Sequence, residues 1–425
     1  MLNFVAACVT ILASAIPGPQ AGNVESARIY ASEAPYGNAA TSKFRNPPEG
    51  YTLFFIETIG RHGSRAAVSP GDENQVLKFL NQAKDVDGLT EKGEQLEEDI
   101  KRFQAAEKKL GYGQLSALGK SELAGLGRRT ADNYAEFFSR AEEDGDDIAF
   151  VTSPVKRTKD SAEAMKGSLK QRFPDLDFAK NAVSDKLLVI DGNPSLLGLE
   201  HLSRYKKLPD LQIAANNVLA NVFQPQYIET LKSPRKVALA IYKVFQRAPG
   251  LVAESDVTFE QYVDPADAEI LGHWETAEKF YRYGAGVRGE DQSYRGARPL
   301  LNNFMKRLQE RVDGGKTAAV FRLAHGETVM PFTALTQLRS ANQQEPKGGL
   351  YGDEFNPFRG WKSGLIAASI ECAAYRNEAG KVLLTLRFNE EPSRFSKACK
   401  PEEPNGLFYS LAEIKRCIND PGGFV

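Results

Sequence analysis

Two patterns of apolar and polar positions alternate along the chain. Compact apolar runs, which are typical of buried strands, occupy 51–60, 147–154, 316–324 and both arms of 363–392. Longer stretches carry apolar residues every three or four positions, which predicts helices within 74–140 and at 155–173 and 297–314. Thr90 and Ser116 each stand three residues before a glycine and are predicted helix N-caps.

The order of these elements predicts the domain organisation. Strands that alternate with helices favour an α/β fold with a parallel-rich sheet flanked by helices. We expect this core to consist of 51–174 and 291–425, preceded by an N-terminal extension at 22–50. The strand pattern is lost within 175–290, where helical periodicity continues, so this stretch predicts an inserted, mostly α-helical cap domain.

Composition and charge narrow the class of partner. The chain has 425 residues, of which 42% are hydrophobic, enough to build a sizeable core. Its 54 Lys and Arg residues balance 55 Asp and Glu residues, so no global positive field is available to gather nucleic acid. A local basic pocket remains compatible with this balance, because net charge does not describe clustering.

The first 21 residues predict a secretory signal peptide. A short apolar run is followed by small residues and prolines, with cleavage expected after Ala15 or Ala21, and the protein is then secreted or periplasmic. The alternative is a buried N-terminal helix, since no Lys or Arg precedes the run. No stretch reaches the ~18 apolar residues of a membrane-spanning helix, so no membrane span is expected.

The cysteines allow one disulfide bond in an exported chain. Cys399 and Cys417 flank a small C-terminal unit and are the preferred pair, while Cys372, in a predicted strand, is expected to be a buried free thiol. The alternative is that all three are reduced.

Candidate chemistry gathers where predicted strands end. The residues concerned are Arg61, His62 and Arg65 after the first strand, Arg157 after the second, and His325 with Glu327 after the third. Because ligands of open α/β sheets collect beyond the carboxyl ends of the strands, we expect these side chains to converge. Taken singly, the Arg-His-Gly triplet is compatible with a surface turn and His325 with a structural histidine.

Together these groups suit phosphoryl transfer. Guanidinium groups bind phosphate oxygens through bidentate, charge-assisted hydrogen bonds, and helix N-termini add backbone donors. A neutral histidine can attack phosphorus, and a carboxylic acid can protonate the leaving oxygen. The guanidinium groups neutralise the charge, so we expect neither a metal ion nor a cofactor.

Three motifs carry a family resemblance. "RHGSR" (61–65) and "HGE" (325–327) resemble the paired signatures of the histidine phosphatase superfamily, in its acid phosphatase and phytase branch. The stretch 153–169 is similar to the segment that carries a further phosphate-binding arginine in that branch. Within the branch, the chain looks most like the multiple inositol polyphosphate phosphatases, which have His-Ala-Glu where many acid phosphatases have His-Asp. The resemblance covers roughly 50–420.

The resemblance implies a role for each matching residue. His62 is expected to be the nucleophile and Glu327 the proton donor. The transferring phosphate is expected to be held by Arg61, Arg65, Arg157 and His325. The family's alanine is a glycine here, Gly326, which has more backbone freedom and bears on where Glu327 lies.

The implied substrate is a small polyanion, inositol hexakisphosphate and lower inositol phosphates. Two alternatives remain: a broad-specificity histidine acid phosphatase acting on sugar phosphates, and a phospho-ligand binding protein without catalysis. A basic cluster around His201 could face a polyanionic substrate or form a solvated turn, whereas His273 beside Trp274 predicts packing. "GAGVRG" (284–289) follows a helical pattern rather than a strand, which argues against a dinucleotide site. The sequence leaves the oligomeric state open.

Overall fold

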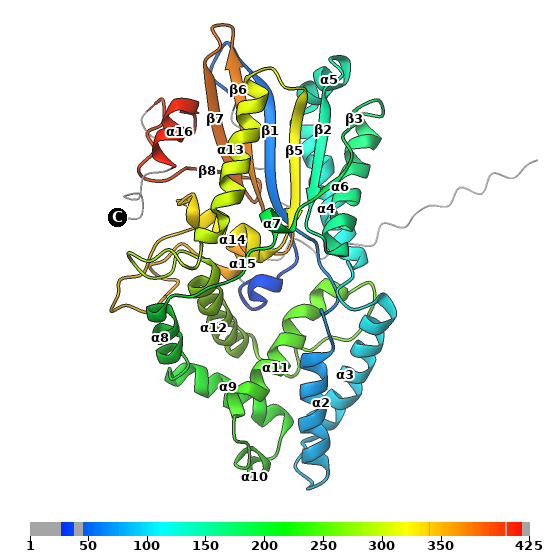
Figure 1. The fold of residues 1–425 in the computed structure, drawn as a ribbon. Helices are drawn as coiled ribbons and strands as arrows, with labels where there is room; N and C mark the ends of the chain where they lie inside the picture. The colour runs from blue at the N-terminus through cyan, green and yellow to red at the C-terminus, as the bar shows by residue number, and fades with distance from the viewer. Residues whose placement is uncertain (1–26, 38–45, 340, 404–405, 419–425) are drawn as a thin grey trace, which may run out of the picture.

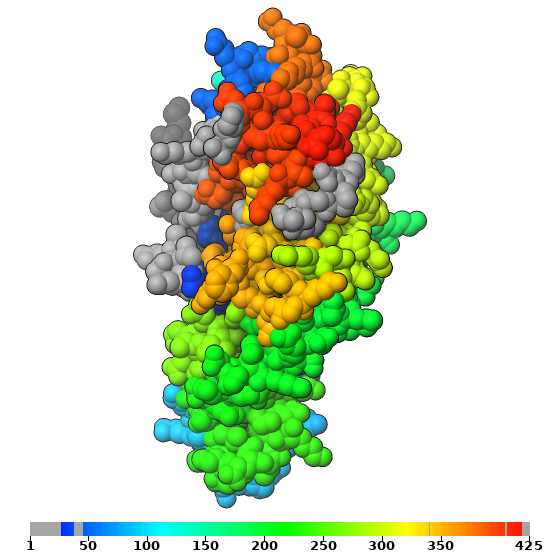
Figure 2. All heavy atoms as spheres, turned by 90° about the vertical axis from the view of Figure 1, so that its left-hand side faces the viewer, coloured from blue at the N-terminus to red at the C-terminus, as the bar shows by residue number. Residues whose placement is uncertain are grey.

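In the computed structural model, the described residues are 27–37, 46–339, 341–403 and 406–418. The predicted signal peptide, residues 1–21, lies outside them, and so does part of the predicted N-terminal extension. Figure 1 shows two parts, a sheet with flanking helices above and a helical layer below. Figure 2 shows the same division from the side, with the orange and red segments in the upper part and the helical layer at the bottom.

The described residues form one nine-stranded mixed sheet, with β3-β2-β5-β1-β6-β7-β8 as its main path, β4 beside β2 and β9 beside β7. The strands are β1 Tyr51–Arg61, β2 Asp147–Thr152, β3 Asp177–Phe178, β4 Ala182–Val183, β5 Thr317–Ala324, β6 Ser369–Asn377, β7 Val382–Phe388, β8 Glu391–Ser393 and β9 Tyr409–Ser410. All of the predicted strands are therefore present.

The centre of the sheet is parallel and one side of it is antiparallel. Strand β5 lies between β1 and β2 and is parallel to both, while β6 and β7 continue the sheet in antiparallel register. Because β1, β2 and β5 run in the same direction, their carboxyl ends meet at one edge, which faces the helical layer (Figure 1). The predicted parallel-rich α/β core is confirmed.

Helices cover both faces of the sheet. One face packs against α4 Ala117–Asn133, α5 Ala135–Glu143 and α6 Lys156–Arg172. The other packs against α13 Arg298–Val312, α14 Gly326–Leu335 and α16 Leu411–Cys417. Each face buries a continuous apolar cluster, which is what the near-continuous apolar runs of the central strands require.

The second part of the molecule is helical. Its longer helices are α2 Gly71–Lys84, α3 Glu91–Leu110, α8 Leu196–Tyr205, α9 Pro209–Val222, α11 Pro234–Arg247 and α12 Pro265–Tyr283. Short elements complete the fold: α7 Asp185–Leu188, α10 Pro225–Ile228, α15 Gly360–Ser363, and the 3₁₀ helices η1 Ala31–Glu33, η2 Ala248–Leu251 and η3 Arg295–Ala297.

The packing divides the chain differently from the expected boundaries. Helices α2 and α3, which the sequence placed in the core, pack against α11 and α9 of the helical layer. Conversely, β3 and β4 lie within the expected cap stretch but pair with β2 in the sheet. Helical periodicity shows that a helix has a buried face without showing which partner covers it. Two-residue strands leave no period to detect.

The predicted caps and disulfide are present. Thr90 Oγ1 accepts a hydrogen bond from Gly93 N, and Ser116 Oγ accepts one from Gly119 N, each at 3.0 Å. Cys399 and Cys417 form a disulfide, and Cys372 is a buried free thiol. Within the described ranges, no helix combines the length and apolarity needed to cross a membrane.

The disulfide predicts a measurable stability loss. The cysteines are 18 positions apart, and closing a loop of that length stabilises a protein by about 3 kcal/mol. The double variant Cys399→Ser, Cys417→Ser should therefore unfold at lower denaturant concentration than the wild type, as followed by circular dichroism. Reducing agent should lower the wild-type midpoint to the same value and leave the double variant unchanged. A wild-type midpoint that ignores reduction would contradict a stabilising disulfide.

Candidate active site

A pocket of about 410 Å³ lies at the carboxyl edge of the parallel strands. Its lining residues are Glu33, Arg61, His62, Arg65, Val68, Val155, Arg157, Val189, Ile190, Asp191, Lys279, Tyr283, His325 and Glu327. All six residues that the sequence singled out are among them, so the predicted convergence is confirmed. Within the described part of the chain, no three or more His, Cys, Asp or Glu side chains form a group that could hold a metal ion.

His62 follows directly after β1 and is fixed at both its backbone and its ring. Its backbone N donates to Ala324 O on β5 at 3.0 Å. Its ring Nδ1 lies 2.8 Å from Gly63 O. A carbonyl oxygen only accepts, so Nδ1 carries the proton of the neutral ring and Nε2 keeps its lone pair.

The surroundings of His62 keep its ring neutral. The side chain is buried, and burial together with the nearby charges of Arg61, Arg157 and Arg65 holds its pKa well below the usual range of histidine. Both causes disfavour the imidazolium form. At ordinary pH the ring is therefore a base with a free Nε2.

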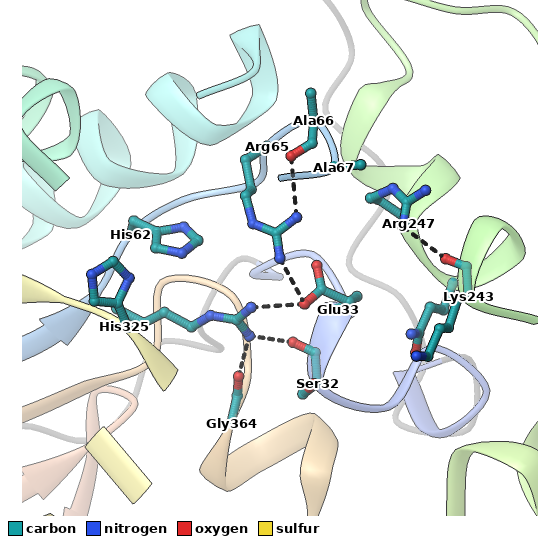
Figure 3. Close-up of polar contacts among 12 residues, drawn as sticks. Ser32, Glu33, His62, Arg65, Ala66, Ala67, Lys243, Arg247, His325 and Gly364 are labelled. Atoms are coloured by element: carbon teal, nitrogen blue, oxygen red, sulfur yellow. Dashed lines mark hydrogen bonds and ion pairs between the residues drawn. The ribbon is translucent and has the colours of Figure 1, made fainter. Parts of the chain in front are cut away.

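His325 stands edge-on to His62. The ring centroids are 5.5 Å apart with an interplanar angle of 71° (Figure 3). His325 Nδ1 lies 3.2 Å from an Arg157 Nη atom, which only donates, and Nε2 lies 2.9 Å from Ser153 Oγ. In the neutral ring the proton is thus on Nε2. Burial and the Arg157 charge lower the pKa of His325 to about 4.

Three guanidinium groups enter the pocket from two segments. Arg61 and Arg65 come from the segment at the end of β1, and Arg157 comes from the first turn of α6. Burial and the like charges of Arg65 and Arg61 lower the pKa of Arg157 to about 10. The Nε atom of each of the three is buried without a hydrogen-bond partner. Unused donors on like-charged groups are what an anion would satisfy.

Two carboxylates partly offset this positive charge. Glu33 Oε1 lies 2.8 Å from Arg61 Nη2 and 3.5 Å from Arg65 Nη2. Glu327, at the start of α14, lies 3.3 Å from Lys279 Nζ of α12. Burial alone would raise the pKa of Glu327, but Lys279 and Arg61 outweigh it and hold the pKa at about 2.

Gly326 is not required for this placement of Glu327. A Cβ built on Gly326 would lie 3.5 Å from its nearest neighbour, the Arg61 side chain, which is an ordinary contact. The alanine that the related phosphatases are expected to have at this position therefore fits the same backbone.

A buried carboxylate holds the loop that carries His62 and the two arginines. Glu122 of α4 accepts hydrogen bonds from Ser64 N at 2.7 Å, from Ser64 Oγ at 3.0 Å and from Tyr36 N at 2.8 Å. The same helix approaches the loop so closely that a Cβ on Gly63 would lie 2.3 Å from Gly119 O. A side chain at Gly63 would force the loop and the helix apart.

Comparison with protein families matches residues 52–355 to the histidine phosphatase superfamily, branch 2. The chain belongs to this family. It is therefore a histidine-type phosphatase rather than a phospho-ligand binding protein without catalysis. No curated protein sequence matches the chain.

Solved structures of phosphatases and phytases share the fold. The *Bifidobacterium longum* multiple inositol polyphosphate phosphatase, in complex with inositol hexasulfate, superposes with a TM-score of 0.86 at 22% identity, covering 92% of this chain and 97% of that one. The phytase of D. castellii superposes with a TM-score of 0.68 at 12% identity, covering 95% of this chain and 87% of that one. The *Hafnia alvei* phytase with myo-inositol hexakis sulphate gives 0.54 at 12% identity, covering 88% and 97%.

Two other histidines of this histidine phosphatase lie outside the pocket lining. His201 is buried between Tyr281, whose OH lies 3.2 Å from Nδ1, and Lys347 O, which lies 2.8 Å from Nε2. Both of its ring nitrogens therefore have partners within the protein. His273 packs edge-on to Tyr205 at 5.8 Å, as predicted. The "GAGVRG" stretch follows α12 and not a strand.

Sequence reasoning missed four residues of the site: Glu33, Glu122, Ser153 and Lys279. Glu33, Glu122 and Lys279 reach the site or its loop from segments that carried none of the three motifs. Glu122 and Lys279 occupy ordinary helical positions, and Glu33 lies in the N-terminal extension. The one available signal was Ser153, which stands at the end of a predicted strand beside Arg157.

The Glu122 contacts predict a loss of activity on a minimal substitution. Each carboxylate oxygen of Glu122 accepts a hydrogen bond from a backbone N–H group, one from Ser64 and one from Tyr36. In Glu122→Gln the side-chain NH₂ group replaces one of these oxygens, so in either orientation of the amide it faces a backbone N–H. Leaving such a buried group unsatisfied costs about 1–3 kcal/mol. We expect a lower thermal unfolding midpoint and kcat/KM reduced about tenfold or more.

Glu254→Gln is the matched control. Glu254 also accepts a backbone hydrogen bond, from Ala117 N at 2.8 Å at the start of α4, but only its Oε1 atom does so, and a glutamine keeps that acceptor. This variant should retain wild-type activity. Equal activity in the two variants would show that Glu122 does not position the loop.

Proposed function

We propose that this phosphatase releases phosphate from inositol hexakisphosphate and lower inositol phosphates through a phosphohistidine at His62. In this proposal Nε2 of His62 attacks phosphorus while Arg61, Arg65, Arg157 and His325 hold the phosphate oxygens. The observation that carries the proposal is a buried, neutral His62 with a free Nε2 among three guanidinium groups that have unused donors. Donors fixed around the developing charge stabilise the transition state without reorganisation.

Glu327 is the proposed proton donor to the leaving oxygen. As the P–O bond to the inositol breaks, the carboxylic acid of Glu327 protonates that oxygen. The resulting carboxylate then takes a proton from the water that attacks the phosphohistidine, which returns His62 to its neutral form. The negative charge of a bound phosphate counteracts Lys279 and Arg61, so binding of the substrate raises the pKa of Glu327 towards the value a donor needs.

The proposed substrate rests on the pocket and on its relatives. A volume of about 410 Å³ lies within the range of small-molecule sites. The *B. longum* phosphatase and the *H. alvei* phytase were each solved with a sulfated inositol bound. These observations support an inositol polyphosphate as the substrate.

A second candidate, a broad-specificity acid phosphatase, is favoured by the wall of the pocket. Val68 and Val189, which line the pocket, are 65% and 46% exposed, and Val155, Ile190 and Tyr283 also contribute to the lining. Among the lining residues, Lys279 is the one cation besides the three arginines. A substrate with several phosphates gains little from apolar walls, whereas a monoester with an uncharged body fits them.

We also propose that the protein acts outside the cytoplasm. The disulfide between Cys399 and Cys417 supports this, because such bonds persist in oxidising compartments. The predicted N-terminal signal peptide supports the same location.

Product analysis after incubation with inositol hexakisphosphate tests the proposed function. The wild type should release phosphate and form lower inositol phosphates, resolved by ion chromatography. His62→Ala should abolish release, because the nucleophile is missing, and should leave the circular dichroism spectrum unchanged. Wild-type-like turnover in His62→Ala would refute the nucleophile assignment.

A second substrate in the same assay separates the two candidate functions. An inositol polyphosphatase should show a higher kcat/KM for inositol hexakisphosphate than for p-nitrophenyl phosphate. A clear preference for p-nitrophenyl phosphate would favour the broad acid phosphatase instead.

The ion pair of Glu327 predicts a change in pH dependence. Lys279→Met removes the cation that lowers the pKa of Glu327 most, so that pKa should rise. A donor is active below its pKa, and the high-pH limb of the kcat profile should therefore move upward by about 1–3 pH units. Steady-state kinetics across pH measure the shift.

Glu327→Gln is the control for this assignment. Without the titrating carboxyl group, the Lys279→Met substitution should no longer move the limb in the double variant. A limb that stays fixed in Lys279→Met, or that moves downward, would show that Glu327 is not the group whose titration limits turnover.

A further inference from the structure

An acidic side chain occupies the anion-binding groups of the pocket. Glu33 belongs to η1, in the segment before β1, and its carboxylate lies against Arg61. The same carboxylate also lies against Arg65 (Figure 3). The Glu33 side chain is 15% exposed and lines the pocket. The carboxylate therefore sits among the groups that are proposed to hold the transferring phosphate.

The two arginines have other partners that hold them in place. Nη1 of Arg61 donates to the backbone oxygens of Ser32 and Gly364. Nη1 of Arg65 donates to Ala66 O at 3.1 Å. These acceptors are uncharged backbone groups, so the guanidinium groups keep their orientation whether or not Glu33 is charged.

The effect of Glu33 on a bound anion is therefore mainly electrostatic. Its carboxylate takes up the Nη2 atoms of both arginines, which a phosphate would otherwise share in bidentate contacts. It also repels a phosphate at close range. Arg247 lies on the opposite side of Glu33 (Figure 3). Its charge acts on Glu33 less than those of Arg65 and Arg61, and it is already paired with Glu73 and Glu107.

Weaker binding of free phosphate is useful in such a pocket. Three guanidinium groups and Lys279 would hold the phosphate product strongly, and strong binding of product slows its release. Interactions that bind every state of a reaction equally do not raise kcat. A fixed internal carboxylate lowers affinity for the free anion while leaving the arginines aligned.

We propose that Glu33 sets the affinity of the pocket for phosphate by occupying Arg61 and Arg65, and so limits inhibition by the product. This inference rests on the proposed function in one respect, that phosphate binds at these arginines. It makes Glu33 a residue that determines affinity and product release, acting through Arg61 and Arg65.

Calorimetric titration with inorganic phosphate tests the inference directly. Glu33→Gln removes the charge while keeping the shape and one oxygen acceptor for Arg61. Its dissociation constant for phosphate should fall about tenfold or more relative to the wild type. In steady-state assays the competitive inhibition constant for phosphate should fall in parallel. Glu33→Ala, a second charge-free variant, should change in the same direction.

Two controls separate charge from other effects. Glu33→Asp keeps the charge and should bind phosphate with nearly wild-type affinity. Glu269→Gln removes a carboxylate that pairs with Arg28 at an exposed position outside the pocket, and it should leave both phosphate affinity and activity unchanged.

The outcomes distinguish this inference from the proposed function. Unchanged or weaker phosphate binding in both charge-free variants, with wild-type binding intact, would overturn the role of Glu33 and leave the function standing. A wild type that binds no phosphate would contradict the site itself. Tighter binding in Glu33→Gln and Glu33→Ala, with Glu33→Asp and Glu269→Gln near the wild-type value, would establish the role.

Discussion

Repulsion among the guanidinium groups of Arg61, Arg65 and Arg157 is the constraint on which the rest of the site depends. All three are brought to a buried imidazole, where low solvent exposure strengthens every charge interaction, and Arg157 has its pKa lowered to about 10 as a result. Backbone oxygens and the carboxylates of Glu33 and Glu327 make this concentration of charge tolerable without a ligand. Burial, together with the charges of the same guanidinium groups, lowers the pKa of His62 and keeps its ring neutral. The feature that is costly for folding therefore also provides a nucleophile.

The architecture explains how distant segments meet at this point. Parallel pairing of β1, β5 and β2 brings three strand ends to one edge, and the helical layer closes the space beyond it. Both parts of the molecule contribute side chains to the pocket. The core supplies His62, His325 and the three arginines, and α12 of the helical layer supplies Lys279. The segment before β1, which packs against α12 and α15, adds Glu33. The ion pair between Lys279 and Glu327 therefore couples the proposed proton donor to the helical layer.

The sequence predicted the longer strands, two helix N-caps and the six motif residues because each has a strong local signal. A run such as 51–60 has one plausible structure, and His62 follows it directly. The partners of these residues could not be predicted from the sequence. Glu122, for example, has the pattern of any charged helical position, and its burial depends on tertiary packing. Helices α2 and α3 were predicted to belong to the core, and not to the helical layer, for the same reason: amphipathic periodicity marks a buried face but does not identify the surface that covers it. Glu33 could not be found at all, since its segment has neither a period nor a motif.

The central claim is that His62, held neutral among guanidinium groups, becomes covalently phosphorylated during turnover. Rapid mixing with substrate, quenching in alkali and mass spectrometry of the digested protein measure this most directly, because phosphohistidine survives alkaline conditions. The account predicts a phosphoryl group on the peptide that contains His62, formed within the first turnover and absent in His62→Ala. A phosphoryl group on His325 instead, or full turnover with no phosphorylated peptide at any time, would contradict it.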